Sequence, residues 1–462
     1  MFMAAMEATV VATAMPTVIS ELGGIRLYGW VGAAYLLAST VTVPLYGKLA
    51  DRQGRKPVLM LGIILFLLGS LASGLSTSIV LLIVYRAIQG LGAGAMQPIV
   101  LTVIGDLYTP EERGRVQGLF SAVWGFAGIS GPLLGGAIVE LTSWRWIFFI
   151  NLPFGLIAIA VLAWAYREAP RHEAHSTPLD IMGSLAILFA SLALLLAASN
   201  VFVWPMALTA VLLIIAFIAI ERRAPDPVLP IPLLTRRLIA SATIASFLLG
   251  SAMMGILNFL PLHVQGVLRA MPQEAGLVLA PMLVGWPLAS AVTSRLLMRT
   301  GYRRPVLLGA AFTALALIAL IPLVSFRAPS IFLASAMFVF GLGMGLANTA
   351  IVIGVQASVG WEQRGVVTAV TMFSRTIGGA LGVGALGALL AARLGRTLSP
   401  ETVRALLDPH NQSAAIEPNT ADALGLALDP LFLTGGAIAV LTCLAVLAYP
   451  DDRIVNRQFT NK

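Results

Sequence analysis

Two charged residues, Glu7 and Arg86, lie inside long apolar stretches of the sequence. A carboxyl group in such surroundings can exchange a proton, because burial disfavours its charged form while a nearby arginine favours it. A cation inside an apolar stretch is costly, so it normally faces a partner or a wet cavity. Glu7 is therefore a candidate for proton exchange, and Arg86 is a candidate for a partner or a cavity-facing residue. Two other interpretations stay open: Glu7 could be a solvated residue near an interface, and Arg86 could simply bind backbone carbonyls.

A second candidate group lies in Gly47–Lys56, where Asp51 stands among four cations. A tight, glycine-containing turn would hold this acid at the end of a helix, where it could pair with Arg115 or meet a helix N-terminus. Such a cluster could latch two helices in one conformation and release them in another. The alternative is that the cations only set the orientation of the loop, but an acid is unnecessary for that purpose. The predicted latch residues are Gly47, Asp51, Arg52, Gly54, Arg55 and Arg115.

The composition indicates which kind of element carries these residues. Of 462 residues, 58% are hydrophobic and 11% are charged, whereas a soluble domain carries about 25% charged residues. About 20 consecutive apolar residues cross the hydrocarbon core of a bilayer as a helix. The chain therefore lacks the polar surface of a water-soluble protein, and we expect a polytopic membrane protein. Its net charge of +8 is explained by topology rather than by binding to nucleic acid.

Fourteen apolar blocks can be marked along the chain, and in lipid each must be a helix because its backbone groups have no other partners. The Lys and Arg residues lie mainly in alternate connections, 20 on one side against 7 on the other. The positive-inside rule then places both termini in the cytoplasm. The blocks lie near 1–19, 28–47, 58–75, 79–104, 115–139, 145–166, 180–198, 202–220, 238–262, 275–298, 304–324, 330–355, 366–392 and 429–449.

An internal repeat relates the two halves of the chain. With a shift of 251 residues, Gly90–Gly94 matches Gly341–Gly345, and Glu111–Gly114 matches Glu362–Gly365. Many transporters build a central site between two such repeated bundles. The shift covers about eight blocks, which predicts that two helices are inserted between two six-helix halves. We expect bundles at 1–168 and 223–462, an inserted pair at 169–222, and an extracellular loop at about 393–428.

Several of these stretches resemble motifs of the major facilitator superfamily. Gly47–Lys56 is similar to its signature loop, and Leu82–Gly90 is similar to the motif whose arginine, here Arg86, is linked to proton coupling. The stretch Gly128–Gly136 resembles the motif that marks antiporters, and hence exporters. Its expected functional residues are Gly128, Gly131, Pro132 and Gly135. Small residues on one helix face also serve close packing, which stays a parallel interpretation.

Two further stretches resemble the fourteen-helix drug:proton antiporter branch of this superfamily. Met6–Pro16 is similar to the first-helix motif of that branch, with Glu7 where Asp is usual, and Trp144–Pro153 is typical of it. Only six residues precede Glu7, which is about 9 Å of helix. Either the natural start of the first helix lies upstream or the first helix is short, and we expect the former.

The resemblance implies an all-α fold of fourteen spans and an exporter that uses alternating access. We expect a proton-coupled antiporter of amphipathic compounds, with cationic drugs favoured, that works as a monomer in the bacterial cytoplasmic membrane. The alternative cargo is an endogenous lipid, siderophore or metabolite. A membrane sensor or enzyme is disfavoured because the sequence shows no soluble domain and no catalytic or metal-ligand cluster. The sequence has no Gly-rich loop of the kind that binds ATP, so we expect no cofactor and a proton gradient as the energy source. The expected cavity residues are Gln97, Trp124, Asn258, Trp286, Asn348, Phe373 and Arg375.

Overall fold

The described part of the chain is helical throughout. The computed structural model describes residues 27–168, 180–198, 203–224, 227, 229–270, 272–394 and 418–450, together with 3, 6–7, 10–11, 15, 17–18 and 21–22. Its helices are α2 (Tyr28–Gln53), α3 (Arg55–Gly74), α4 (Ile79–Leu107), α5 (Pro110–Leu141), α6 (Trp146–Phe149), α7 (Asn151–Ala165), α8 (Ile181–Ala198), α9 (Val203–Glu221), α10 (Ile231–Leu234), α11 (Arg237–Gly266), α12 (Pro272–Thr300), α13 (Arg303–Ser325), α14 (Ser330–Ala357), η2 (Trp361–Gln363), α15 (Arg364–Leu394) and α17 (Pro418–Leu447).

Ten helical segments in the described residues are long and apolar enough to cross a membrane. They include α6 together with α7, as one segment from Trp146 to Ala165, and they leave out α2, α5 and the shorter α8. Charged and small residues at one end of α2 and along α5 lower the hydropathy of these two helices. The first expected block, 1–19, lies mostly outside the described residues. The structure thus supports an all-α membrane fold, and the count of fourteen spans stays a prediction.

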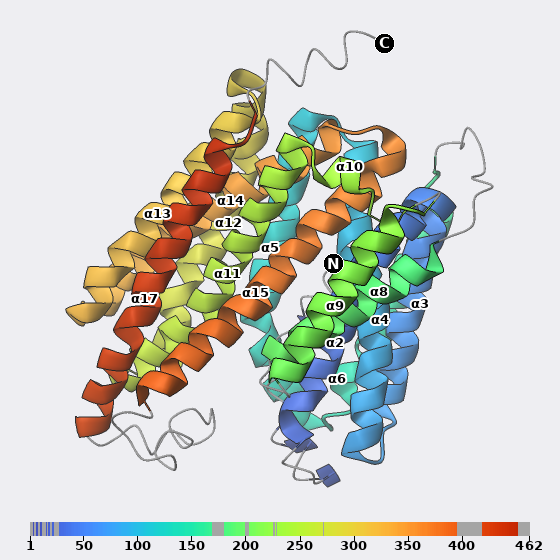
Figure 1. The fold of residues 1–462 in the computed structure, drawn as a ribbon. Coiled ribbons are helices and arrows are strands. Elements are labelled where there is room, and N and C mark those ends of the chain that lie inside the picture. The colour runs from blue at the N-terminus through green and yellow to red at the C-terminus, as the bar shows by residue number, and fades with distance from the viewer. Residues whose placement is uncertain are drawn as a thin grey trace.

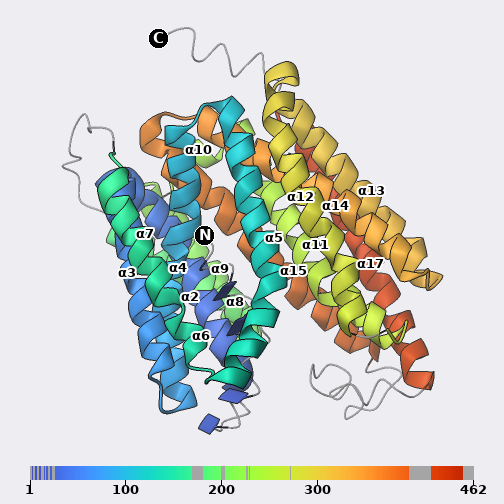
Figure 2. The ribbon, with the colours of Figure 1, turned by 180° about the vertical axis from the view of Figure 1, so that it is seen from behind.

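The long helices form two groups that lie side by side (Figures 1 and 2). In the first group, α4 packs against α2 and α3, while α7 packs against α3. In the second, α14 packs against α12 and α13, and α17 packs against α11 and α13. Helices α8 and α9 pack against each other, and α8 also contacts both α2 and α15. The expected domain boundaries at 168 and 222 stay predictions.

Two helix crossings join the groups, α2 with α15 and α5 with α12. The repeat shift of 251 residues carries α2 onto α12 and α5 onto α15, so the two crossings are related by the internal repeat. Both depend on glycine. A Cβ atom on Gly47 would lie 2.4 Å from the Ala369 Cβ, and one on Gly114 would lie 2.5 Å from the Ser294 Cβ. Glycine therefore lets the helix backbones approach closely at these two points.

Glu21, which precedes α2, binds the stretch of chain just before α6. This contact lies at the end of the first group where α2 begins. Glu21 Oε2 accepts hydrogen bonds from Trp144 Nε1 at 2.9 Å and from Arg145 Nη1 at 2.8 Å. Donation by Trp144, and then by Arg145, holds the pKa of Glu21 below its usual range. Trp144 is fully buried and packs edge-on against Phe148, so the contact ends on a rigid anchor.

Candidate functional site

Asp51, in the last turns of α2, caps the first turn of α15 in the other group of helices. Its Oδ1 accepts from the backbone N–H of Gly365 at 2.8 Å, and its Oδ2 accepts from that of Val366 at 2.7 Å. The first N–H groups of a helix have no partner within the helix, and they carry the positive end of its dipole. The Asp51 carboxylate, supplied by another helix, accepts hydrogen bonds from these N–H groups and balances the positive end of the dipole. This contact with a helix N-terminus is one of the two partners that the sequence suggested for Asp51, the other being Arg115. Asp51 is 6% exposed, so water competes little for these bonds.

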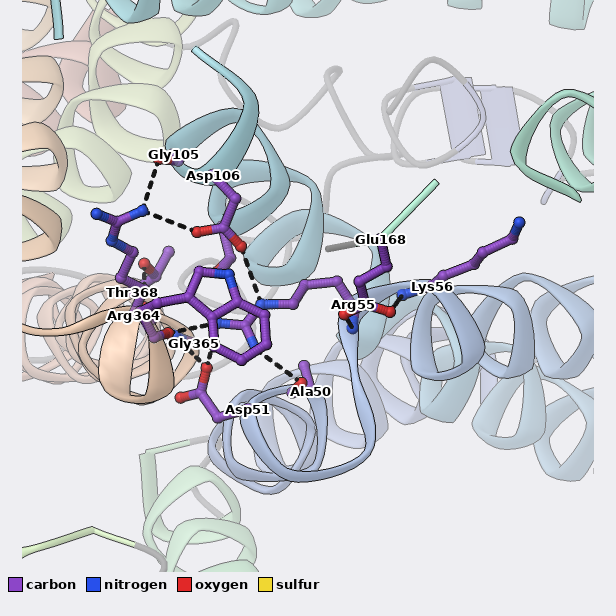
Figure 3. Close-up of polar contacts among 12 residues, drawn as sticks. Ala50, Asp51, Arg55, Lys56, Gly105, Asp106, Glu168, Arg364, Gly365 and Thr368 are labelled. Carbon is purple, nitrogen blue, oxygen red and sulfur yellow. Dashed lines mark hydrogen bonds and ion pairs between the residues drawn. The ribbon is translucent and has the colours of Figure 1, made fainter. Parts of the chain in front are cut away.

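Arg55 connects this cap to α4. Its Nη2 lies 2.8 Å from Asp51 Oδ1, and its Nε donates to Asp106 Oδ2 at 3.0 Å. Arg364 Nη1 donates to the other oxygen of Asp106, also at 3.0 Å. Figure 3 shows that these four side chains converge from α2, α3, α4 and α15. We call Asp51, Arg55, Asp106 and Arg364 the charged network, and the end of the molecule that carries them the charged end.

Aromatic and backbone contacts complete the surroundings of Arg55. The guanidinium carbon lies 3.9 Å from the centre of the Trp361 ring, and Nη2 donates to the Trp361 carbonyl at 2.7 Å. Nη1 donates to the Ala50 carbonyl at 3.1 Å. The side chain is completely buried, so nearly all of its donors must be satisfied by protein. Trp361 belongs to η2, and it therefore adds a second link between the two helix groups.

The remaining predicted latch residues occupy different positions. Gly54 has φ 104°, which lets the chain turn sharply between α2 and α3. Gly47 gives α15 room to approach α2, and Arg52 lies half-buried in the last turn of α2. The structure does not pair Arg115 with Asp51. Arg115 is exposed on α5 and lines a cavity of about 440 Å³ with Glu112, Arg295, Met298 and Arg299.

Sequence reasoning missed two acids of this site, Asp106 and Glu168. Asp106 joins two arginines from different groups, as described above. Glu168 accepts the backbone N–H of Arg55 at 2.7 Å and that of Lys56 at 3.4 Å, so it caps the start of α3. Asp106 stands at the end of an apolar block and its repeat counterpart is Ala357. The repeat therefore gave no sign of its role.

Glu7 and Arg86 meet inside the first group of helices. Arg86 Nη1 contacts Glu7 Oε1 directly, and Asn151 Nδ2 donates to Glu7 Oε2 at 2.7 Å. Both charged side chains are about 2% exposed. Arg86 also donates to Gln89 Oε1 at 2.6 Å and to the Val31 carbonyl at 3.3 Å. The carboxylate thus has two donors, and the arginine has two further acceptors besides it.

An aromatic face and a hydroxyl extend this buried pair. The guanidinium of Arg86 lies 4.4 Å from the centre of the Tyr35 ring. Asn151 Nδ2 also donates to Ser70 Oγ at 3.1 Å, and Ser70 in turn donates to the Phe148 carbonyl at 2.8 Å. Asn151 belongs to the stretch that suggested the antiporter branch, but its contact with Glu7 was not foreseen. This arrangement can hold either an ion pair or, after proton uptake, a neutral carboxyl hydrogen-bonded to Asn151.

The predicted antiporter motif lies within α5. Gly135 is buried there, and the surroundings of Gly128, Gly131 and Pro132 lie outside what the structure describes. The expected bend at Pro132 and its link to the direction of transport stay predictions.

Of the predicted cavity residues, the structure joins two directly. Arg375 Nη1 donates to Asn348 Oδ1 at 2.7 Å, which links α15 to α14. Asn258 is exposed and donates to the Met254 carbonyl at 2.8 Å. The side chain of Trp124 lies outside the described residues, and the other members, Gln97, Trp286 and Phe373, are half-buried on α4, α12 and α15. Gln97 is the repeat counterpart of Asn348.

Comparison with known proteins places this arrangement in a family. The sequence pattern of the Major Facilitator Superfamily matches residues 1–383. The chain therefore belongs to this superfamily; it is a multi-pass membrane transporter and not an enzyme. Members of the superfamily use ion gradients and need no cofactor. Within the described residues, no group of three or more His, Cys, Asp or Glu side chains is placed to hold a metal ion.

The proteins similar to this chain include two from Bacillus subtilis (strain 168). The chain is 35% identical to the multidrug transporter protein MdtP over 412 residues, which cover 87% of this chain and 76% of MdtP. It is 31% identical to multidrug resistance protein 3 over 394 residues, which cover 83% of this chain and 76% of that protein.

Solved structures confirm the fold. A bacterial homologue of the iron transporter ferroportin, in an outward-facing state, superposes with a TM-score of 0.63 at 13% identity over 97% of this chain and 98% of that one. The human organic anion transporter MFSD10 gives a TM-score of 0.61 at 16% identity over 95% of this chain and 97% of that one.

Proposed function

We propose that this chain is a secondary active transporter that exports amphipathic organic compounds in exchange for protons. The observation that carries the proposal is the buried contact between Glu7 and Arg86, with Asn151 as second donor to the carboxylate. The names of the two Bacillus relatives, a multidrug transporter and a multidrug resistance protein, support the choice of cargo. Export of an endogenous lipid, siderophore or metabolite on the same fold is the alternative.

The proposed mechanism is alternating access between the two groups of helices. The excess of Lys and Arg assigns the charged end to the cytoplasm by the positive-inside rule. The charged network joins the groups at this end, so the present conformation would be closed toward the cytoplasm. Export then requires that Asp51 leave the first turn of α15, so that the charged end opens and admits cargo.

Proton binding would act through the partner of Glu7. Protonation removes the negative charge that balances Arg86, and an unbalanced buried cation is costly. Arg86 would then depend on Gln89, on the Val31 carbonyl and on any acceptor that the moving helices or the cargo provide. Protonation of Glu7 would in this way favour a change of conformation, because only another conformation can give the Arg86 charge a new partner.

Purified protein in sealed vesicles with an imposed pH gradient tests this proposal, with ethidium and an amphipathic acid as probes. We expect Glu7→Gln to abolish gradient-driven movement of the transported probe, because an amide cannot exchange a proton, and Glu7→Asp to retain part of it. Glu140→Gln is the matched control, since Glu140 is an exposed acid of α5. Unimpaired gradient-driven transport in the Glu7→Gln variant would contradict the role of Glu7. Absence of gradient-driven movement for every probe in the wild type would contradict the proposed function.

A further inference from the structure

Arg375 is a cation near the middle of a helix that joins the two groups. It lies eleven residues after Arg364, the first residue of α15, which is about 16 Å along the helix axis. This distance is about half the thickness of the hydrocarbon core. The side chain is half-buried, and its hydrogen bond in the described structure goes to Asn348 Oδ1 at 2.7 Å. A guanidinium has five N–H donors, so one amide oxygen satisfies only a small part of them.

No carboxylate of the described residues balances this charge. Helices α11 and α14, which contact Arg375, and α15 itself contain no Asp or Glu. Asp51 of α2 and Asp106 of α4 lie at the charged end and are bound within the charged network. On α17, Asp422 contacts Arg327 and Asp429 accepts from Ser325.

Glu7, the acid that lies inside the first group of helices, is also bound by other side chains. It contacts Arg86 and accepts from Asn151. A charged side chain inside a membrane protein normally faces a partner or a wet cavity, and it marks a substrate or ion pathway. For Arg375 the described chain offers an amide and no acid. The described residues thus leave this charge without a fixed acidic partner.

The apolar side chains nearest to Arg375 in the sequence lie on the other side of α15. Phe373 and Ile377, two residues before and after Arg375, belong to one cluster with Val41 of α2 and Phe247 of α11, and side chains two residues apart on a helix do not face each other. A ligand that binds at Arg375 would therefore meet the guanidinium and the amide of Asn348. The polar end of such a ligand is an acceptor with two oxygens, because a guanidinium matches a carboxylate with two parallel hydrogen bonds.

We propose that Arg375 and Asn348 bind the carboxylate of an amphipathic organic acid, so that the exported compounds are anions rather than the cations expected from the sequence. This inference rests on the proposed export function and names its class of cargo. Asn348 holds the guanidinium in place through Oδ1, and the apolar body of the acid is the apolar part of the amphipathic cargo proposed above. A cationic drug would instead meet Arg375 at close range, and like charges in a site of low dielectric repel strongly.

Binding to the purified full-length protein tests the proposal with three fluorescent probes. These are 7-(diethylamino)coumarin-3-carboxylic acid, its ethyl ester, which has the same apolar body without the charge, and ethidium as a cation. We expect the acid to bind the wild type at least about 10-fold more tightly than the ester, as for a hydrogen bond to a charged group. We expect Arg375→Gln to reduce this preference to less than about 2-fold, and Arg375→Lys to retain part of it. Arg393→Gln is the matched control, because Arg393 is an exposed arginine at the end of the same helix.

Equal binding of acid and ester by the wild type would overturn the proposal, and so would a preference for ethidium. These comparisons need no variant, so they hold even if Arg375→Gln does not fold. An unchanged preference in a folded Arg375→Gln variant would also overturn it. The proposed export function is tested separately, by transport that the pH gradient drives. If ethidium moves with the pH gradient while the acid does not bind, this inference is wrong and the antiport remains.

Discussion

The cap that Asp51 places on α15 can be tested by the single change Asp51→Asn. The carboxylate accepts two backbone N–H groups, from Gly365 and Val366, and a hydrogen bond to a charged group contributes about 1.5–3 kcal/mol. An asparagine has one oxygen, so it can keep one of these bonds, now a neutral bond of about 1 kcal/mol. Arg55 keeps Asp106 and two carbonyls as partners. The closed charged end therefore loses at least about 2 kcal/mol, which is at least about 30-fold in the ratio of open to closed molecules.

Distances between spin labels on the two groups measure this ratio directly. Leu61 of α3 and Leu308 of α13 are both 44% exposed and lie near the charged end, outside the network. They can be replaced by cysteine after the single natural cysteine, Cys443, has been changed to serine. We expect the population with the long distance, relative to that with the short distance, to rise by at least about 30-fold in Asp51→Asn.

The matched control is Glu362→Gln, which removes an acid from η2, three residues before Gly365. No hydrogen bond joins Glu362 to α15 in the described structure, so we expect the ratio to stay at the wild-type value. If folded Asp51→Asn keeps the wild-type ratio, the cap does not hold the charged end closed. If Glu362→Gln raises the ratio as much, the effect is one of net charge and not of the cap.

Three further predictions use the same labels or a thermal melt. Gly365→Ala would place a Cβ 2.6 Å from Asp51 Oδ1, so we expect this variant to open the charged end. The control is Gly360→Ala, whose Cβ would meet no atom within 4 Å and should leave the distances unchanged. Equal effects of the two variants would contradict the close approach of Asp51 to Gly365. Asp106→Asn weakens contacts with two arginines, so we expect its charged end to be open more often than in the wild type. The free-energy change of the double variant with Asp51→Asn should be smaller than the sum of the two single changes. A double variant that equals this sum would show that the two contacts are independent. For Glu21, whose pKa is lowered in the folded state, the stabilisation is present above the ordinary pKa and is lost as pH falls through the lowered value. The melting temperature of Glu21→Gln should thus lie slightly below that of the wild type at neutral pH and approach it in acid, and a difference that grows on acidification would contradict this.

Sequence reasoning singled out Glu7 and Arg86 because charges are rare in apolar stretches, and their role in proton coupling stays a prediction. In a region with so few acids and bases, two opposite charges on neighbouring spans have little choice of partner. The same argument singled out Asp51 among its cations, but it could not choose between Arg115 and a helix N-terminus. Both partners suit an acid, and the choice depends on how α2 crosses α15.

Asp106 and Asn151 could not be assigned in this way. Asp106 ends an apolar block, where an acid normally faces water, and its role depends on Arg55 and Arg364 arriving from other helices. Asn151 is neutral, so its position in a span raises no electrostatic question until Glu7 is placed beside it. Contacts of this kind are properties of the packing, and neither the period nor the composition of one segment records them.

The two helix N-termini related by the repeat differ in a way that bears on the mechanism. At the start of α5, Glu112 accepts the backbone N–H of Thr109 at 3.0 Å, a contact within its own segment. At the start of α15, the acceptor is Asp51, from the other group of helices. The repeat counterpart of Asp51 is Tyr302, which has no carboxylate to offer α5.

Separation of the groups therefore costs hydrogen bonds at the α2–α15 crossing, whereas the cap of α5 stays intact at the α5–α12 crossing. The first crossing has these hydrogen bonds in addition to its small residues, Gly47 against Ala369, whereas the second crossing has small residues in contact, Gly114 against Ser294. Such a contact is lost gradually with distance, while a capped helix start is either bonded or exposed. One crossing can thus set a threshold for opening while the other serves as the pivot. An Asp51→Asn variant should lower that threshold without loosening the pivot.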